Sequence, residues 1–176
     1  GAGGGGGGGG GGSGAASGSC TSSGNSAASF ETAEYLASYA LKEINASSAY
    51  ALGCTGQGVT VAVLDGPSDS DHPDLDANYV TGWDASHSDT NSDCGRLAGC
   101  TGSHGVHVAG IIAAEKNGSG MHGVAYNAKI KPIAIFDDAD SDDTNTVQLA
   151  TAISQGSGSS IAVMNNSWGA ATVKTY

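Results

Sequence analysis

Basic side chains are scarce in this chain of 176 residues: six Lys and Arg accompany seventeen Asp and Glu, so the formal net charge is −11 at pH 7. This charge disfavours nucleic acid and anionic membrane surfaces as partners, because both are themselves negative. An acidic balance of this size mainly keeps a protein soluble.

Long apolar runs are absent as well. No stretch of eighteen consecutive apolar residues occurs, so the sequence predicts no transmembrane segment. No apolar signal-peptide core precedes the glycines at the beginning of the chain, and we expect that any export signal has already been removed.

Charged residues are missing from the first 29 positions, and twelve of the first fourteen residues are glycine. A segment of this composition cannot bury enough surface to offset the entropy lost on ordering it. We therefore predict a Gly/Ser-rich flexible segment over residues 1–29 and one folded domain over residues 30–176.

The chain has only four cysteines. Cys94 and Cys100 bracket the stretch CGRLAGC, which a disulfide bond can close and which lacks the second ligand pair that a zinc site needs. We predict a bridge between Cys94 and Cys100, which favours an oxidising compartment. The sequence leaves the pairing of Cys20 and Cys54 open.

Helix-like and strand-like segments alternate after residue 30. Apolar residues at helical spacing predict helices in ETAEYLASYALKEINASSAYAL, VHVAGIIAAE and TVQLATAIS. The residues expected to face inward on the first and last of these are Leu36, Tyr39, Ala40, Ile44, Leu149, Ala152 and Ile153.

Strands are expected in VTVAVLD, YVTGWD, AKIKPIAIF and SIAVMNNS. Strands that alternate with helices form a parallel sheet covered on both faces, so the predicted fold class is α/β. In such sheets the chemistry collects beyond the carboxyl ends of the strands.

This rule singles out Asp65, which ends the first strand, and His104, which opens a helix. A buried aspartate can hold an imidazole in one tautomer, as in a Ser-His-Asp triad. Taken singly, Asp65 is equally typical of a turn before Gly66 and Pro67, and His104 of a helix start without chemistry. A catalytic zinc site at His104, His107 and His122 is disfavoured, because the motif lacks the Glu of HExxH.

Four stretches in combination resemble the subtilisin-like serine proteases, the subtilase family of peptidase S8 type. They are GQGVTVAVLDGPSDSDHPDL, SHGVHVAGIIA, GVAYNAKI and VMNNSWG, in that family's order and approximate spacing. The resemblance implies a subtilisin-like three-layer fold that is incomplete at its carboxyl-terminal side, with residues 30–176 as the amino-terminal portion of a peptidase domain. It also implies that Asp65 and His104 are catalytic and that His107 is structural. This chain departs from the family pattern at Gly66, Pro67 and Val106.

The same resemblance places substrate binding at Ser167, Trp168 and Gly169, where a peptide adds as a β-strand. A core role for Trp168 is the alternative. The run DDADSDD falls where the family places the opposite side of the substrate groove. It is either a solvated loop or a source of preference for basic residues upstream of the cut.

No cofactor is required for this chemistry, but many subtilases bind calcium. The resemblance makes Asp74 and Asn117 its possible ligands, through carboxylate and amide oxygens. Protein or peptide substrates are the implied partners, together with the remainder of the same protease.

A Gly-Thr-Ser block that would carry the nucleophile is missing, as is the asparagine block of the oxyanion hole. Neither Ser119 nor Ser167 lies in the sharp turn that exposes a nucleophile. The sequence therefore predicts part of a serine endopeptidase, inactive alone. The lead-in before Gly56 is similar to that of bacterial autotransporter subtilases, which implies a secreted or cell-surface location. The alternative is a noncatalytic binding module on the cell surface.

Overall fold

The computed structural model of the chain describes residues 20–94, 103–136 and 146–169. Helices and strands alternate along most of this part of the chain, as the sequence predicts. In chain order the elements are η1 (Ala27–Phe30), α1 (Ala33–Ala37), α2 (Tyr39–Glu43), α3 (Ala46–Ala51), β1 (Thr60–Asp65), β2 (Trp83–Asp84), α4 (Ser103–Ala113), β3 (Lys129–Ala134), α5 (Thr146–Gly156) and β4 (Val163–Asn166).

The four described strands form one parallel sheet in the order β2-β3-β1-β4. Each predicted strand is present, although β2 is only two residues long. Asp65, Ala134 and Asp84 are register partners across three neighbouring strands, so they form one row at the carboxyl edge of the sheet. The α/β prediction is confirmed.

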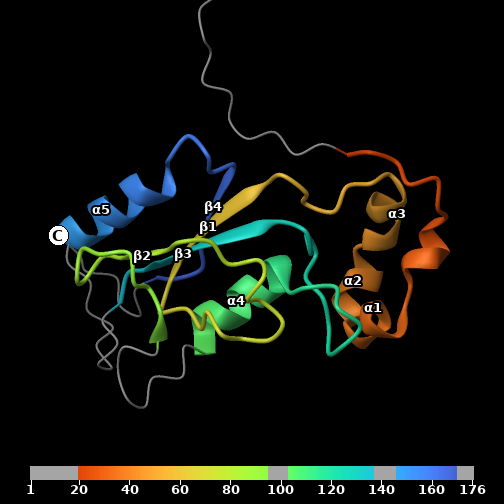
Figure 1. Ribbon diagram of the computed structural model, residues 1–176, viewed down its shortest axis with the longest axis horizontal. Coiled ribbons are helices and arrows are strands. Elements are labelled where there is room, and N and C mark those ends of the chain that lie inside the picture. Colours follow the sequence, from red (N-terminus) through yellow and green to blue (C-terminus); the bar gives the residue numbers. More distant parts are fainter. Residues whose placement is uncertain (1–19, 95–102, 137–145, 170–176) are drawn as a thin grey trace, which may run out of the picture.

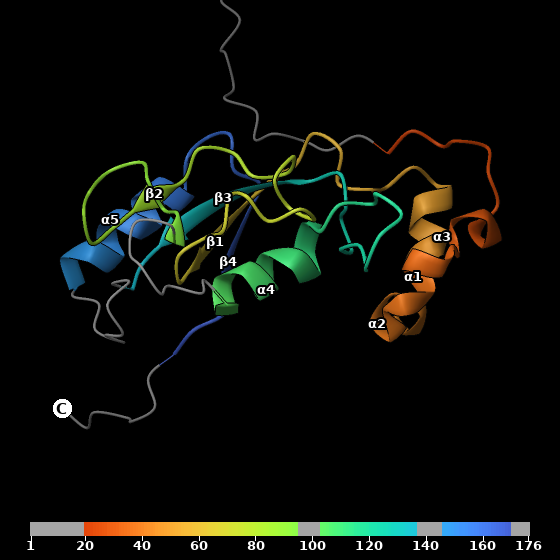
Figure 2. The ribbon, with the colours of Figure 1, turned by 60° about the horizontal axis from the view of Figure 1, so that its bottom comes forward.

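Helices cover the two faces of the sheet (Figure 1, Figure 2). Successive side chains of a strand point to opposite faces, and β1 follows this rule. Val61 and Val63 pack with Ala109 and Ala113 of α4, whereas Ala62 and Leu64 pack on the other face. The α5-side core consists of Ala62, Leu64, Ala85, Ile133, Ile135 and Ala152. A strand that packs on both faces explains the continuous apolar run of β1.

The amino-terminal helical region differs from its prediction. Instead of one helix it forms three short ones, α1 to α3, which lie together at one end of the molecule (Figure 1). Asn45 between α2 and α3 has a φ of 54°, which no continuous helix allows. The predicted inward residues Leu36, Tyr39 and Ile44 are exposed.

An aromatic cluster takes the place of the predicted apolar stripe. Tyr35 and Tyr50 are buried in it, and their rings contact the ring of the buried His122. The Tyr35 hydroxyl donates to the carbonyl of Leu41 at 2.8 Å, which fixes α1 against the end of α2. Hydrogen bonding and ring packing thus override simple helical periodicity here.

One inward position on α5 was also wrong. Ala152 is fully buried and Leu149 is half-buried, as expected, but Ile153 is 43% exposed. α5 therefore presents the small side chain of Ala152 to the sheet, because Leu64 and Ile133 already fill the space beneath it.

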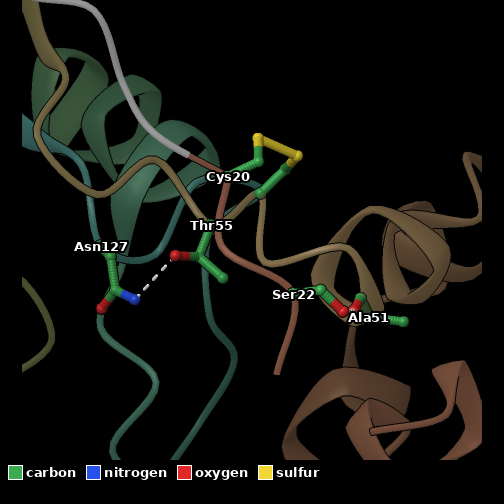
Figure 3. The surroundings of a disulfide bond; sticks show 6 residues. Cys20, Ser22, Ala51, Thr55 and Asn127 are labelled. Atoms are coloured by element: carbon green, nitrogen blue, oxygen red, sulfur yellow. Dashed lines mark hydrogen bonds between the residues drawn. A yellow bond between two sulfur atoms is a disulfide. The ribbon is translucent and has the colours of Figure 1, made fainter. Parts of the chain in front are cut away.

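A disulfide bond ties the beginning of the described chain to the domain. Cys20 pairs with Cys54, across 34 residues of sequence (Figure 3). Beside it, the Asn127 amide donates to the Thr55 hydroxyl at 2.9 Å. Residues 20–29 thus already have contacts with the domain whose start was predicted at residue 30.

Among the described residues, no helix is both long and apolar enough to span a bilayer.

Candidate active site

Asp65 lies at the carboxyl end of β1 with its side chain buried. Its Oδ1 accepts the backbone N–H of Gly66 at 2.7 Å, and only 1% of the residue is exposed. Within the described part of the chain, Oδ2 is also buried and has no hydrogen-bond partner. Gly66 offers this carboxylate a backbone donor but no side-chain donor.

His104 meets this carboxylate from the first turn of α4. Its Nδ1 lies 2.7 Å from Oδ1 of Asp65, while 67% of the imidazole side chain is exposed. An ionised carboxylate accepts a hydrogen bond, so this contact makes Nδ1 the donor and fixes the tautomer. The other ring nitrogen, Nε2, remains to take a proton from a group on the solvent side.

Gly105 makes this contact possible. A Cβ on Gly105 would lie 2.8 Å from the carbonyl oxygen of Gly66 and 3.2 Å from Oδ1 of Asp65. Contacts shorter than about 3 Å force one group to move, so any side chain here would push α4 away from β1. This role was not predicted from the sequence, although the glycine stands directly after His104.

Ser167, Trp168 and Gly169 follow the end of β4, next to the strand that carries Asp65. Asn166 pairs in register with Leu64, so Ser167 begins beside the Asp65 end of β1. Ser167 and Gly169 are exposed, whereas Trp168 is half-buried and packs against the α5-side core. The backbone of this segment is therefore accessible, while the indole has the core contacts of the alternative prediction.

Asp74 and Asn117, the predicted calcium ligands, do meet. The Nδ2 group of Asn117 donates to Oδ1 of Asp74 at 3.0 Å, and its Oδ1 accepts the backbone N–H of Ser119 at 3.0 Å. Turning the amide over would set its oxygen against the Asp74 carboxylate, so the donor faces Asp74. The described residues contain no group of three His, Cys, Asp or Glu that could hold a metal ion. As they lie, Asn117 presents its amide donor to Asp74, and its side-chain oxygen faces the backbone of Ser119.

Two further predictions concern residues that lie outside the described part of the chain. These are the acidic run at 137–143 and Cys100, the proposed partner of Cys94. Both predictions stand untested.

A second carboxylate and imidazole pair lies two strands away from Asp65. Asp84, at the end of β2, is 3% exposed, and its Oδ2 lies 2.8 Å from Nδ1 of His87. Burial by itself raises the pKa of this carboxyl, but hydrogen bonds from Ser86 and His87 outweigh it and lower the pKa below its ordinary value. Because Ser86 and Asp84 both approach the same ring nitrogen of His87, this cluster is not a second triad.

The fold and site define an α/β protein that brings a buried aspartate and an exposed histidine together at the carboxyl edge of a parallel sheet. Residues 56–176 match the Subtilase family, and the chain belongs to that family.

Relatives include fervidolysin from Fervidobacterium pennivorans, 40% identical over 123 residues, which cover 65% of this chain and 17% of fervidolysin. An extracellular serine protease from Serratia marcescens is 35% identical over 144 residues, or 82% of this chain and 13% of that protein. The crystal structure of the serine protease of Aeromonas sobria superposes with a TM-score of 0.60 at 30% identity, covering 75% of this chain and 22% of that one.

The chain thus spans less than a quarter of each of these relatives. It is homologous to subtilisin-like serine endopeptidases over this portion.

Proposed function

We propose that this chain is part of a secreted or cell-surface serine endopeptidase in which Asp65 orients His104 and His104 acts as general base. The hydrogen bond between Nδ1 of His104 and Oδ1 of Asp65 carries the proposal. A buried carboxylate on one nitrogen and an open second nitrogen are what proton transfer from a serine hydroxyl requires.

The nucleophile and the oxyanion donors belong to the remainder of the protease in this proposal. The substrate peptide binds as an added strand along residues 167–169, whose exposed backbone beside β1 supports this placement. His104 takes the serine proton during attack on the peptide carbonyl and returns it to the leaving amine.

A more specific form of the proposal is that the protease is a subtilase of the bacterial autotransporter kind. It is supported by the resemblance of the segment before Gly56, while the name of the Serratia marcescens relative, an extracellular serine protease, supports only a location outside the cell. The disulfide bond between Cys20 and Cys54 fits an oxidising compartment outside the cytosol.

The test uses the full-length protein that contains this chain. His104→Ala is expected to abolish peptide hydrolysis and labelling of the serine by a fluorophosphonate probe. His107→Ala is the matched control, because His107 lies on the same helix with its side chain exposed, and it should keep both signals. Equal hydrolysis by the His104→Ala variant would contradict the role of His104, whereas a parent protein with neither hydrolysis nor labelling would favour a noncatalytic binding module.

The isolated chain of residues 1–176 is expected to give neither peptide hydrolysis nor fluorophosphonate labelling. Labelling of a serine within it would show that the chain carries its own nucleophile.

A further inference from the structure

The loop at residues 116–120 follows α4 directly, and this is where family resemblance places one of the calcium ligands. We infer that the carboxylate of Glu34, and not a bound calcium ion, holds this loop in place. Glu34 lies more than 80 residues earlier in the chain, on α1.

Both oxygens of Glu34 are engaged by the loop. Oε1 accepts the backbone N–H of Asn117 at 3.0 Å, and Oε2 accepts the backbone N–H of Gly118 at 3.0 Å. Only 7% of Glu34 is exposed. Hydrogen bonds to an ionised and largely buried acceptor are stronger than those between neutral groups, so this contact is a firm cross-link between distant segments.

The loop directs backbone N–H groups toward Glu34, and these donors attract an anion and repel a cation. Gly118 has a φ of 87°, a left-handed turn that lets successive N–H groups point toward one anion. A calcium ion needs oxygen ligands, yet on this side the loop presents hydrogen-bond donors. The Glu34 oxygens are directed at those donors and are not available to a metal.

On its other side the loop is tied to the segment that carries Asp74. The side-chain amide of Asn117 donates to Oδ1 of Asp74, and the backbone N–H of Glu115 donates to the Asp74 carbonyl at 2.7 Å. The other Asp74 oxygen lies 3.0 Å from the place where a Cβ on Gly120 would be. Protein donors therefore already engage Oδ1 and the backbone carbonyl of Asp74, two oxygens that a cation would otherwise use.

The amino-terminal helical region that carries Glu34, from η1 to α3, is itself anchored to the rest of the domain. The hydroxyl of Tyr50 donates to the carbonyl of Val124 at 2.8 Å, and the disulfide bond joins Cys20 to Cys54. The Thr32 side chain accepts the N–H of Tyr35 and caps α1, which fixes the helix turn that holds Glu34. The helix that carries Glu34 is therefore held in place independently of the loop, so little conformational entropy is lost when the carboxylate contacts the loop.

Amide hydrogen exchange of the full-length protease tests this inference at the loop itself. Glu34→Gln removes the charge and turns an amide N–H₂ group toward a backbone donor. We expect exchange at Asn117 and Gly118 to become at least about ten-fold faster. Glu43→Gln is the matched control, since Glu43 is an exposed glutamate on α2, and it should leave those amides unchanged. Calcium or excess EDTA should not alter exchange in the parent protein.

Two results would overturn the inference. One is unchanged loop exchange in the Glu34→Gln variant. The other is a parent protein whose loop exchange slows with calcium and quickens with EDTA, which would show that a metal holds the loop. If Glu34→Gln does not fold, the calcium and EDTA comparison still decides, as does Glu34→Asp, which keeps the charge but shortens the reach and should also quicken exchange.

Discussion

Nδ1 of His104 and Oδ1 of Asp65 are 2.7 Å apart, and the same oxygen accepts the backbone N–H of Gly66. One carboxylate oxygen therefore fixes both the imidazole and the turn that follows β1. This shared acceptor makes the geometry of the candidate active site sensitive to small changes at three features: the end of β1, the turn after it and the start of α4.

The carboxylate of Asp65 is expected to be essential in the full-length protease. Asp65→Asn keeps the shape but places an amide against Nδ1, which favours the wrong tautomer of His104. We expect kcat to fall by roughly 10⁴-fold. Steady-state hydrolysis of a peptide substrate measures this loss, and the Tm of the variant checks that the fold is intact. A kcat equal to that of the parent would show that Asp65 does not orient the base.

Gly105 offers a test of the packing between α4 and β1. Gly105→Ala places a methyl group against the Gly66 carbonyl and the Asp65 carboxylate, so the two must move apart. A displacement of this kind costs roughly 10²-fold in catalytic rate. Activity assays of the full-length protease measure it.

Gly110→Ala on the same helix is the control for that change. Nothing lies within 4 Å of a Cβ added at Gly110, so the substitution should leave activity unchanged. Alanine is the better helix former, and we expect a gain of about 0.5–1 kcal/mol in the free energy of unfolding. Equal activity losses in the two variants would contradict the role assigned to Gly105.

The disulfide bond between Cys20 and Cys54 is expected to stabilise the domain. It closes a loop across 34 residues, and the chain-entropy account gives about 3–4 kcal/mol for such a loop. Replacing both cysteines with serine should lower the free energy of unfolding by that amount in a denaturant titration. A double variant as stable as the parent would mean that the disulfide bond contributes nothing to the stability of the folded state.

Asp84 predicts a particular dependence of stability on pH. Its carboxyl has a lowered pKa in the folded protein, so the folded state binds fewer protons than the unfolded chain. The resulting stability is fully present above the unfolded pKa of about 4 and is lost as the pH falls through the folded value. Asp84→Asn removes this contribution, and the difference from the parent should shrink below about pH 4.

Urea titrations at a series of pH values measure the Asp84 contribution. Asp71→Asn, at an exposed position, controls for the loss of one negative charge and should follow the pH profile of the parent. A difference between parent and Asp84→Asn that stays constant at acid pH would contradict the assignment.

The strands and α4 were predictable because β1 and β3 are short apolar runs between turn residues, and their burial on both faces leaves a clear pattern. The pairing of Asp65 with His104 was predictable for a related reason: strand ends and a helix start meet at one edge of a parallel sheet.

The amino-terminal helices were not predictable in the same way. Their packing depends on hydrogen bonds of Tyr35 to the Leu41 carbonyl and of Tyr50 to the Val124 carbonyl, and on a left-handed Asn45, none of which has a periodic signal. The contact between Glu34 and the loop after α4 is equally hidden, because a glutamate on a short helix is typical of an exposed position.

Two groups of aromatic residues lie apart in the described part of this chain. Both of its tryptophans, Trp83 and Trp168, pack against the α5-side core, whereas Tyr35, Tyr50 and Tyr126 lie in the aromatic cluster near the amino-terminal helices. Selective excitation of tryptophan in this chain therefore reports on the sheet, whereas the tyrosine signal combines the aromatic cluster with the exposed Tyr39 and with Tyr79 on the α4 side of the sheet. Within this chain the tryptophans thus give an intrinsic probe of the sheet, and its melting can be followed without any attached dye.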